Sequence, residues 1–220
     1  HRDDPDVTAH LEAENAYVRE VMKGTEELKE RIFQELRARI PQDDASVPAK
    51  VRDHWYLSRT EDGKNYPIHC RRPAFDGPDT VILDENALAE GHEYCDVGAR
   101  AIGRDQDLLA YAVDYVGRRL YEVHFLRLDT GEELPDRIEG TSGDIVWAED
   151  GKTLFYTRKD PQTLRPDRVY RHVLGSDPAD DVCVFHEPDE TYYVGLDKAS
   201  SREFLDRKST RLNSSHYRTS

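Results

Sequence analysis

Two stretches near the N-terminus carry apolar residues at the spacing of amphipathic helices. In residues 8–23 the apolar positions that share one face are Leu11, Val18 and Met22. After Gly24, which is placed to end this helix, a second stripe recurs every four residues until Pro41 and consists of Leu28, Ile32, Leu36 and Ile40. Thr25 between the stripes is a residue type that favours the N-cap position. The pattern therefore predicts a helical hairpin whose apolar stripe packs against a core.

Beyond residue 48 the apolar residues alternate with polar ones, which is typical of half-buried strands. Two predicted strands, at residues 55–59 and 66–71, flank Asp62 and Gly63, which signal a tight hairpin turn. Further strands are predicted at 80–83, 95–101, 108–114, 121–128, 144–147, 153–158, 168–174, 181–185 and 192–196. No helical pattern separates them, so we expect an all-β region over residues 49–205.

A sequence repeat gives this β region an architecture. IGRDQDLLAY (residues 102–111) aligns with WAEDGKTLFY (residues 147–156), 45 residues further along the chain. A four-stranded propeller blade takes roughly 40 to 50 residues, so a repeat of this period indicates successive blades. The chain is too short to close a ring of such blades. We therefore expect an open arc.

Composition and charge narrow the class of protein. Asp and Glu number 45 against 31 Lys and Arg, a net charge of −14 that argues against nucleic acid as a partner. No apolar run is long enough to span a membrane. Three widely spaced cysteines indicate a reduced, cytoplasmic protein. The sequence begins without a methionine, so a missing signal segment leaves the periplasm open as an alternative.

The residues themselves reveal no active site. The G-x-S-x-G elbow of serine hydrolases is missing, and the nearest string, GTSG at residues 140–143, reads as a β-turn. His172 and His186 are expected on strand surfaces, without a nucleophile nearby. No phosphate loop or dinucleotide fingerprint occurs, so we expect no cofactor.

A zinc site is the one metal centre that the spacing allows. The pairs His69-Cys70 and His92-x-x-Cys95 supply four ligands of suitable type. However, neighbouring residues of a strand point to opposite faces, which separates His69 from Cys70. We therefore predict no metal, and no catalytic or cofactor-binding residue either.

Several strings, in the same order along the chain, resemble the prolyl oligopeptidase family of serine peptidases, in particular its oligopeptidase B branch. They are HLEAENAY (10–17), QDDASVP (42–48), YPIHCRR (66–72), LDEN (83–86), GTSG (140–143), VYRH (169–172) and DETYYV (189–194). Six or more collinear strings carry more weight than any single motif. The resemblance extends over about residues 8–205.

This resemblance implies a seven-bladed propeller that caps an α/β-hydrolase domain holding the catalytic triad. The fold class is then mainly β with N-terminal helices, a helical hairpin followed by about three blades. Residues 1–48 would pack on the hydrolase domain within the same chain, and residues 49–205 would form a partial propeller. Such enzymes hydrolyse short peptides after basic residues. A non-enzymatic propeller that serves as an interaction scaffold is the alternative.

The end of the chain differs in character from the rest. Residues 206–220 are polar, unpatterned and basic, in contrast to the acidic remainder. They resemble the translation of a sequencing adapter, which predicts a non-native tail. An ordinary disordered terminus is the alternative.

Overall fold

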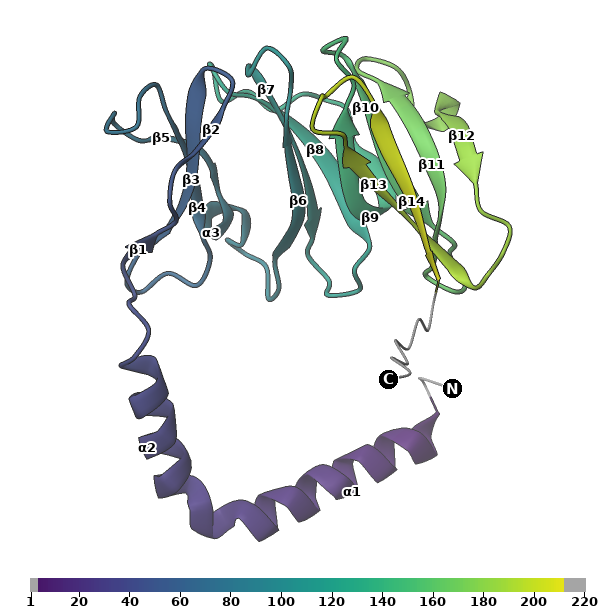
Figure 1. The fold of residues 1–220 in the computed structure, drawn as a ribbon. Coiled ribbons are helices and arrows are strands. Elements are labelled where there is room, and N and C mark those ends of the chain that lie inside the picture. Colours follow the sequence, from purple (N-terminus) through teal and green to yellow (C-terminus); the bar gives the residue numbers. More distant parts are fainter. Residues whose placement is uncertain (1–3, 212–220) are drawn as a thin grey trace, which may run out of the picture. The chain divides into compact units, whose positions relative to one another are not determined.

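A computed structural model describes residues 4–211 of the chain. The chain forms two compact units, one made of residues up to Asp44 with Glu61–Gly63, the other of Ala45–Thr60 with the residues from Lys64 onward. The first unit contains the two N-terminal helices, and the second contains the sheets together with one short helix (Figure 1). The predicted class, mainly β with N-terminal helices, is therefore confirmed.

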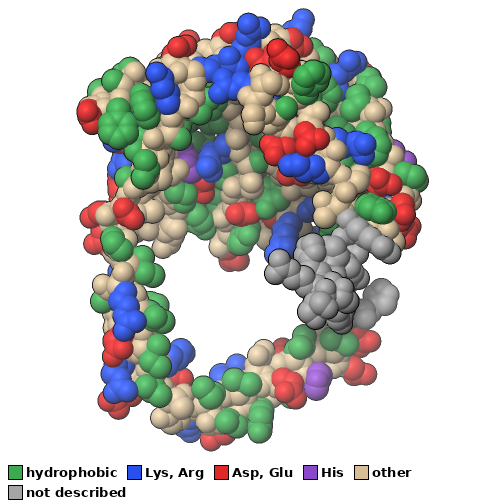
Figure 2. Space-filling model, in the orientation of Figure 1, with side chains coloured by type: hydrophobic (Ala, Val, Ile, Leu, Met, Phe, Trp, Pro, Cys, Tyr) green, Lys and Arg blue, Asp and Glu red, His purple; other side chains and the backbone are tan. Residues whose placement is uncertain are grey.

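The helical unit contains the two predicted helices, but they run apart from the short turn between them, so the predicted hairpin is wrong (Figure 1). Helix α1 (Pro5–Met22) begins after Asp4, whose carboxylate accepts a hydrogen bond from the Asp6 amide, and a 3₁₀ turn (Lys23–Thr25) leads to α2 (Glu26–Arg37). The Thr25 hydroxyl donates back to the carbonyl of Met22, at 2.7 Å, instead of capping α2. No residue of either helix is buried, and Figure 2 shows the hydrophobic side chains exposed along them. Among the described residues, no helix is long and apolar enough to cross a membrane.

The first sheet of the second unit has five strands. They are β1 (Asp44–Ala45), β2 (Ala49–Val51), β3 (His54–Thr60), β4 (Ile68–Arg72) and β5 (Thr80–Asp84). Strands β3, β4 and β5 are antiparallel neighbours in chain order, and both β1 and β2 pair with β3. The predicted hairpin at Asp62 and Gly63 joins β3 to β4. A four-residue helix α3 (Glu85–Leu88), which the pattern did not predict, follows β5 directly.

The second sheet contains seven antiparallel strands in strict chain order. They are β6 (Asp96–Ile102), β7 (Leu108–Asp114), β8 (Tyr121–Arg127), β9 (Ile138–Trp147), β10 (Thr153–Lys159), β11 (Pro166–Val173) and β12 (Val182–His186). A 3₁₀ turn (Pro178–Asp180) precedes β12. Six of the seven strands lie within a few residues of a predicted strand, whereas β9 begins six residues before its predicted start. Over the part of the chain that the structure describes, neither sheet closes on itself (Figure 1).

Strand β9 pairs with two neighbouring strands, mainly through different halves of its length. Its first half pairs with β8 through Ile138 and Thr141, and its second half pairs with β10 over residues 145–147. Gly140 lies within the first half and Gly143 between the halves, with φ angles of +71° and +98°, which favour glycine. The predicted β-turn at GTSG is therefore wrong, because these glycines bend a continuous strand instead of reversing the chain.

The 45-residue repeat appears in the hydrogen bonds of this sheet. The Gly103 amide donates to the Leu108 carbonyl at 2.8 Å, and the Ala148 amide donates to the Thr153 carbonyl at the same distance. Each bond closes the turn that leads into a central strand, β7 or β10. The repeat in the sequence therefore corresponds to a repeated hairpin.

The largest core cluster lies on this repeated framework. Phe125, Ile138, Leu154 and Tyr156 are wholly buried in it, and Trp147 packs edge-on against Phe125 with ring centroids 5.8 Å apart. Burial of such aromatic and branched side chains is the dominant stabilising contribution in a sheet of this kind. The core thus follows the inward positions of the predicted strands.

A final hairpin follows the seven-stranded sheet. Strand β13 (Tyr192–Lys198) pairs along its whole length with β14 (Leu205–Arg211). Residues 206–211 of the predicted tail thus belong to a ladder, and residues 212–220 lie outside the described part. The adapter origin of this segment stays a prediction, which the encoding DNA tests.

Candidate functional site

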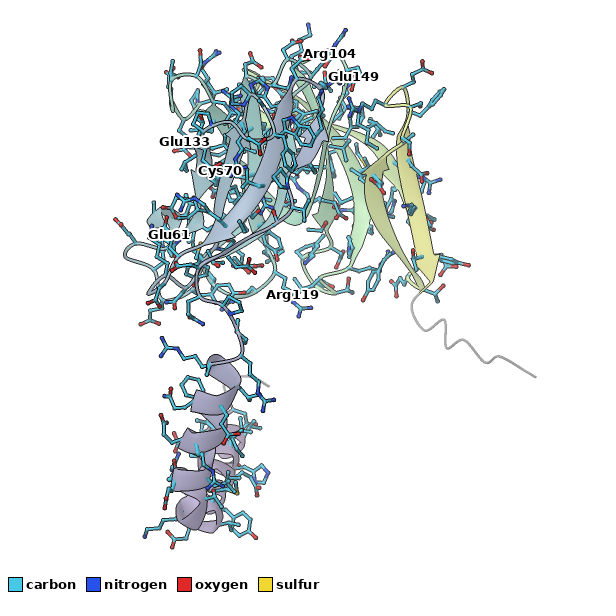
Figure 3. All side chains as sticks on the ribbon, turned by 60° about the vertical axis from the view of Figure 1, so that its left-hand side comes forward. Glu61, Cys70, Arg104, Arg119, Glu133 and Glu149 are labelled. Carbon is cyan, nitrogen blue, oxygen red and sulfur yellow. The ribbon has the colours of Figure 1, made fainter. Side chains whose placement is uncertain are left out.

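A cavity of about 290 Å³ lies in the second unit, where β3, β4 and β5 face β6 and β7. Much of its lining is apolar, and Figure 3 labels one lining residue, Cys70, within the sheets. The apolar lining residues include Val47, Val51, Leu57, Ile82 and Leu109. The polar residues that also line this space are Ser46, Tyr56, Ser58, His69 and Arg100. A mostly apolar cavity with a few converging polar groups is the usual form of a small-molecule site.

The hairpin register brings Ser58 and His69 together. The two residues are direct partners across β3 and β4, so their side chains lie on the same face. Ser58 Oγ lies 2.8 Å from His69 Nδ1. The amide of Ser58 is held separately by Ser46 Oγ at 2.9 Å.

The second ring nitrogen of His69, Nε2, contacts a buried carboxylate. Glu85, the first residue of α3, places Oε1 2.6 Å from His69 Nε2, and only 8% of its side chain is exposed. Arg100, on β6, donates to the same oxygen at 3.2 Å. Asp84 fixes the start of α3 by accepting the Asn86 amide at 2.9 Å. Three strands and a helix start therefore assemble one chain of polar contacts, Ser58–His69–Glu85–Arg100.

The neighbouring thiol does not compete with the serine as a nucleophile. Cys70 is fully buried, and burial raises the pKa of its thiol above the usual value. A thiol with a raised pKa is protonated at neutral pH and reacts slowly.

The predicted metal-type residues do not gather at one point. His69 and Cys70 both line the cavity, whereas Cys95 is buried in a different core cluster beside Tyr111. His92 stacks on Tyr115 with ring centroids 3.9 Å apart. Within residues 4–211 no group of three or more His, Cys, Asp or Glu side chains is arranged to hold a metal ion.

The structure corrects the expectation for His172. Its side chain is wholly buried instead of lying on a strand surface, with Nδ1 2.8 Å from Asp181 and Nε2 3.1 Å from Asp136. The Tyr156 hydroxyl donates to Asp181 at 2.9 Å and completes the cluster. His186 has about half of its side chain exposed, as expected. Both ring nitrogens of His172 therefore face buried carboxylates, and this cluster stabilises the core.

A second polar cluster centres on Glu149, in the turn between β9 and β10. Arg52 approaches its carboxylate at 2.8 Å, Lys198 contacts the same group, and Arg104 donates to its backbone carbonyl at 2.9 Å. Arg104 and Glu149 lie together in Figure 3. Hydrogen bonds from Lys198 and then Arg52 hold the pKa of Glu149 below its usual value. The cluster joins the β2–β3 turn, the β6–β7 turn and β13.

The sequence contained a signal for Ser58 that the motif search missed. A hairpin centred near Gly63 and Lys64 pairs residues whose numbers are equally distant from that turn, which places Ser58 opposite His69. Glu85 could not be found in this way, because the ladder between β4 and β5 shifts register between His69 and Cys70.

Comparison with known families decides what kind of protein this is. The family model for the N-terminal β-propeller domain of prolyl oligopeptidase matches residues 1–217. The chain belongs to the prolyl oligopeptidase family. It corresponds to the N-terminal propeller domain of the family members, as the collinear strings in the sequence indicated.

Individual relatives support the assignment. The chain is 41% identical to dipeptidyl aminopeptidase BI of Pseudoxanthomonas mexicana over 93% of its own length and 30% of that protein. It is 34% identical to protease 2 of Moraxella lacunata, over 93% of the chain and 31% of that protein. Oligopeptidase B of Leishmania major superimposes with a TM-score of 0.89 and 34% identity, over 95% of the chain and 30% of that structure. The chain thus spans about a third of the length of these family members.

Proposed function

We propose that this chain is the N-terminal part of an oligopeptidase B-like serine endopeptidase that hydrolyses short peptides after basic residues. The observation that carries the proposal is the superposition on oligopeptidase B of Leishmania major, with a TM-score of 0.89 at 34% identity. A second solved relative, oligopeptidase B of Trypanosoma brucei, superimposes with a TM-score of 0.86 at the same identity.

In this proposal the chain shapes access to a catalytic domain that lies further along the parent protein. Residues 49–205 would supply about three blades of a seven-bladed propeller, with β9 joining consecutive blades. The helices would pack on the hydrolase domain, in keeping with the exposed apolar residues along α1 and α2. The parent is proposed to be cytoplasmic.

A second candidate activity is the removal of dipeptides from the N-terminus of peptides. The relative with 41% identity is a dipeptidyl aminopeptidase, and this identity is higher than the 34% shared with the two oligopeptidase B structures. The two activities differ in whether the substrate needs a free α-amino group.

The test uses the full-length parent protein and a matched pair of fluorogenic substrates. Both substrates contain the same dipeptide, with arginine directly before the scissile bond. One substrate has a blocked N-terminus and the other a free one. Efficient cleavage of the blocked substrate supports the endopeptidase proposal, and a blocked substrate with lysine should also be cleaved. Cleavage of the free-amine substrate alone would favour dipeptide release. A parent without hydrolase activity would overturn both in favour of a propeller scaffold.

A further inference from the structure

The contacts around His69 fix which of its nitrogens carries the proton. The Glu85 carboxylate accepts hydrogen bonds only, and Arg100 donates to it, so Nε2 of His69 is the donor in the 2.6 Å contact. Nδ1 of the neutral ring is then an acceptor, and the Ser58 hydroxyl donates to it at 2.8 Å. This order, a carboxylate that orients an imidazole and an imidazole that accepts from a hydroxyl, is the arrangement that activates serine nucleophiles.

We propose that Ser58 is a nucleophile of the propeller part, acylated by small carboxylic esters that bind in the adjoining cavity. This inference goes beyond the proposed peptidase function and does not depend on it. It rests on the two short contacts of His69, on the burial of His69 and Glu85 to 4% and 6% exposure, and on the open space beside the half-buried serine.

The cavity defines the class of ester. Its volume of about 290 Å³ equals roughly ten water volumes, enough for a short acyl chain and part of an alcohol group. The apolar lining favours an aliphatic acyl group over a charged one. Arg100 also lines the cavity, and its cationic side chain, partly exposed, suits the negative charge that develops on a carbonyl oxygen.

The reaction balances with water as the only co-reactant. Ser58 Oγ bonds to the carbonyl carbon while its proton moves to Nδ1 of His69. The bond from carbon to the alcohol oxygen then breaks, and the alcohol leaves with the proton from Nδ1. In the second half, water gives a proton to Nδ1 and its oxygen to the acyl carbon. The carboxylic acid departs, and Ser58 regains its proton from the ring.

The test exposes the 220-residue chain to p-nitrophenyl butyrate and, in parallel, to an alkyl fluorophosphonate. The amount of p-nitrophenolate released is measured, and the adducts are located by peptide mass spectrometry. We expect a covalent adduct on Ser58 that is absent from Ser58→Ala and at least tenfold slower to form in His69→Gln and Glu85→Gln. Ser176→Ala is the control, since the Ser176 hydroxyl donates to the Val173 carbonyl and is not among the residues that line this cavity, and it should react like the unmodified chain.

The wild-type chain alone decides the proposal if a variant fails to fold. The absence of an adduct on Ser58 in the folded chain would overturn the proposal. Labelling of Ser58 at the same rate in the chain unfolded by urea as in the folded chain would also overturn it. Labelling of His69→Gln at the wild-type rate in a folded variant would also overturn it, because the imidazole would then play no part. Faster labelling of the folded than of the unfolded chain, confined to Ser58, is the supporting result.

Discussion

The substitution Gly98→Ala tests how tightly Tyr121 of β8 is packed against β6. A Cβ atom built on Gly98 would lie 2.5 Å from Cε1 and 2.7 Å from Cζ of Tyr121. The ring has little freedom to move away. Its hydroxyl donates to Asp96 at 2.6 Å, and its opposite side faces Gly143, where an added Cβ would lie 3.2 Å away. Tyr121 is therefore held between two glycines.

The expected cost follows from this overlap. Ordinary carbon contacts begin at about 3.5 Å, so the methyl group intrudes by roughly 1 Å into a ring that is fixed at both ends. Overpacking of this kind costs about 1–3 kcal/mol. With a urea slope of roughly 2–3 kcal/mol/M, the unfolding midpoint should fall by about 0.3–1.5 M.

Urea titration followed by the fluorescence of Trp147, which is buried in the adjoining core, measures this shift. Gly103→Ala is the matched control, because its nearest neighbour, Cβ of Leu108, would lie at an ordinary contact distance of 3.5 Å. In a Tyr121→Ala background the Gly98→Ala change should cost almost nothing. Equal midpoints for Gly98→Ala and Gly103→Ala would refute the steric argument.

Three further predictions concern the surface, the core and the charge clusters. Because the helices expose apolar side chains such as Phe33, the chain should self-associate through them, and Phe33→Glu should shift its sedimentation toward that of a monomer. A wild-type chain that is monomeric at every concentration would contradict this. His172→Ala should lower the free energy of unfolding by about 3–5 kcal/mol, because two buried carboxylates lose their partner, whereas the exposed His186→Ala should change it little. The pKa of Glu149 is lowered, chiefly by the hydrogen bond from Lys198. The contribution of Glu149 to stability is therefore present above the ordinary pKa of 4.5 and is lost as the pH falls through the lowered value. Glu149→Gln should weaken the dependence of the urea midpoint on pH between pH 6 and 3.

Much of the fold could be predicted because its strands are amphipathic and its turns carry clear signals. The hairpin around Gly63 and the repeated turns before β7 and β10 occur where alternation and turn residues agree. Strand β9 was only half predicted, since its first part contains Gly140 and Gly143, which locally signal a turn. These glycines bend the strand without ending it because β9 pairs with both β8 and β10. The local sequence pattern holds no information about these two neighbours.

The candidate site was harder to predict because its members come from separate elements. Ser58 and His69 follow from the register of one hairpin, but Glu85 and Arg100 reach them only through the packing of β5 and β6. The burial of His172 has the same origin. Its partners Asp136 and Asp181 lie 36 and 9 residues away, the first in an apparently ordinary polar loop and the second at the start of a predicted strand.

The chain-order pairing of β6 to β12 has a consequence for biosynthesis. Every strand of that sheet after β6 pairs with the strand just before it, so the ladders can form in chain order. The first half of β9 can join β8 before β10 has left the ribosome, and its second half then serves as the template for the next hairpin. Each newly added strand meanwhile offers an unpaired edge, as β12 does here. Folding during translation can therefore advance strand by strand, with a single growing edge at risk of mispairing at any moment.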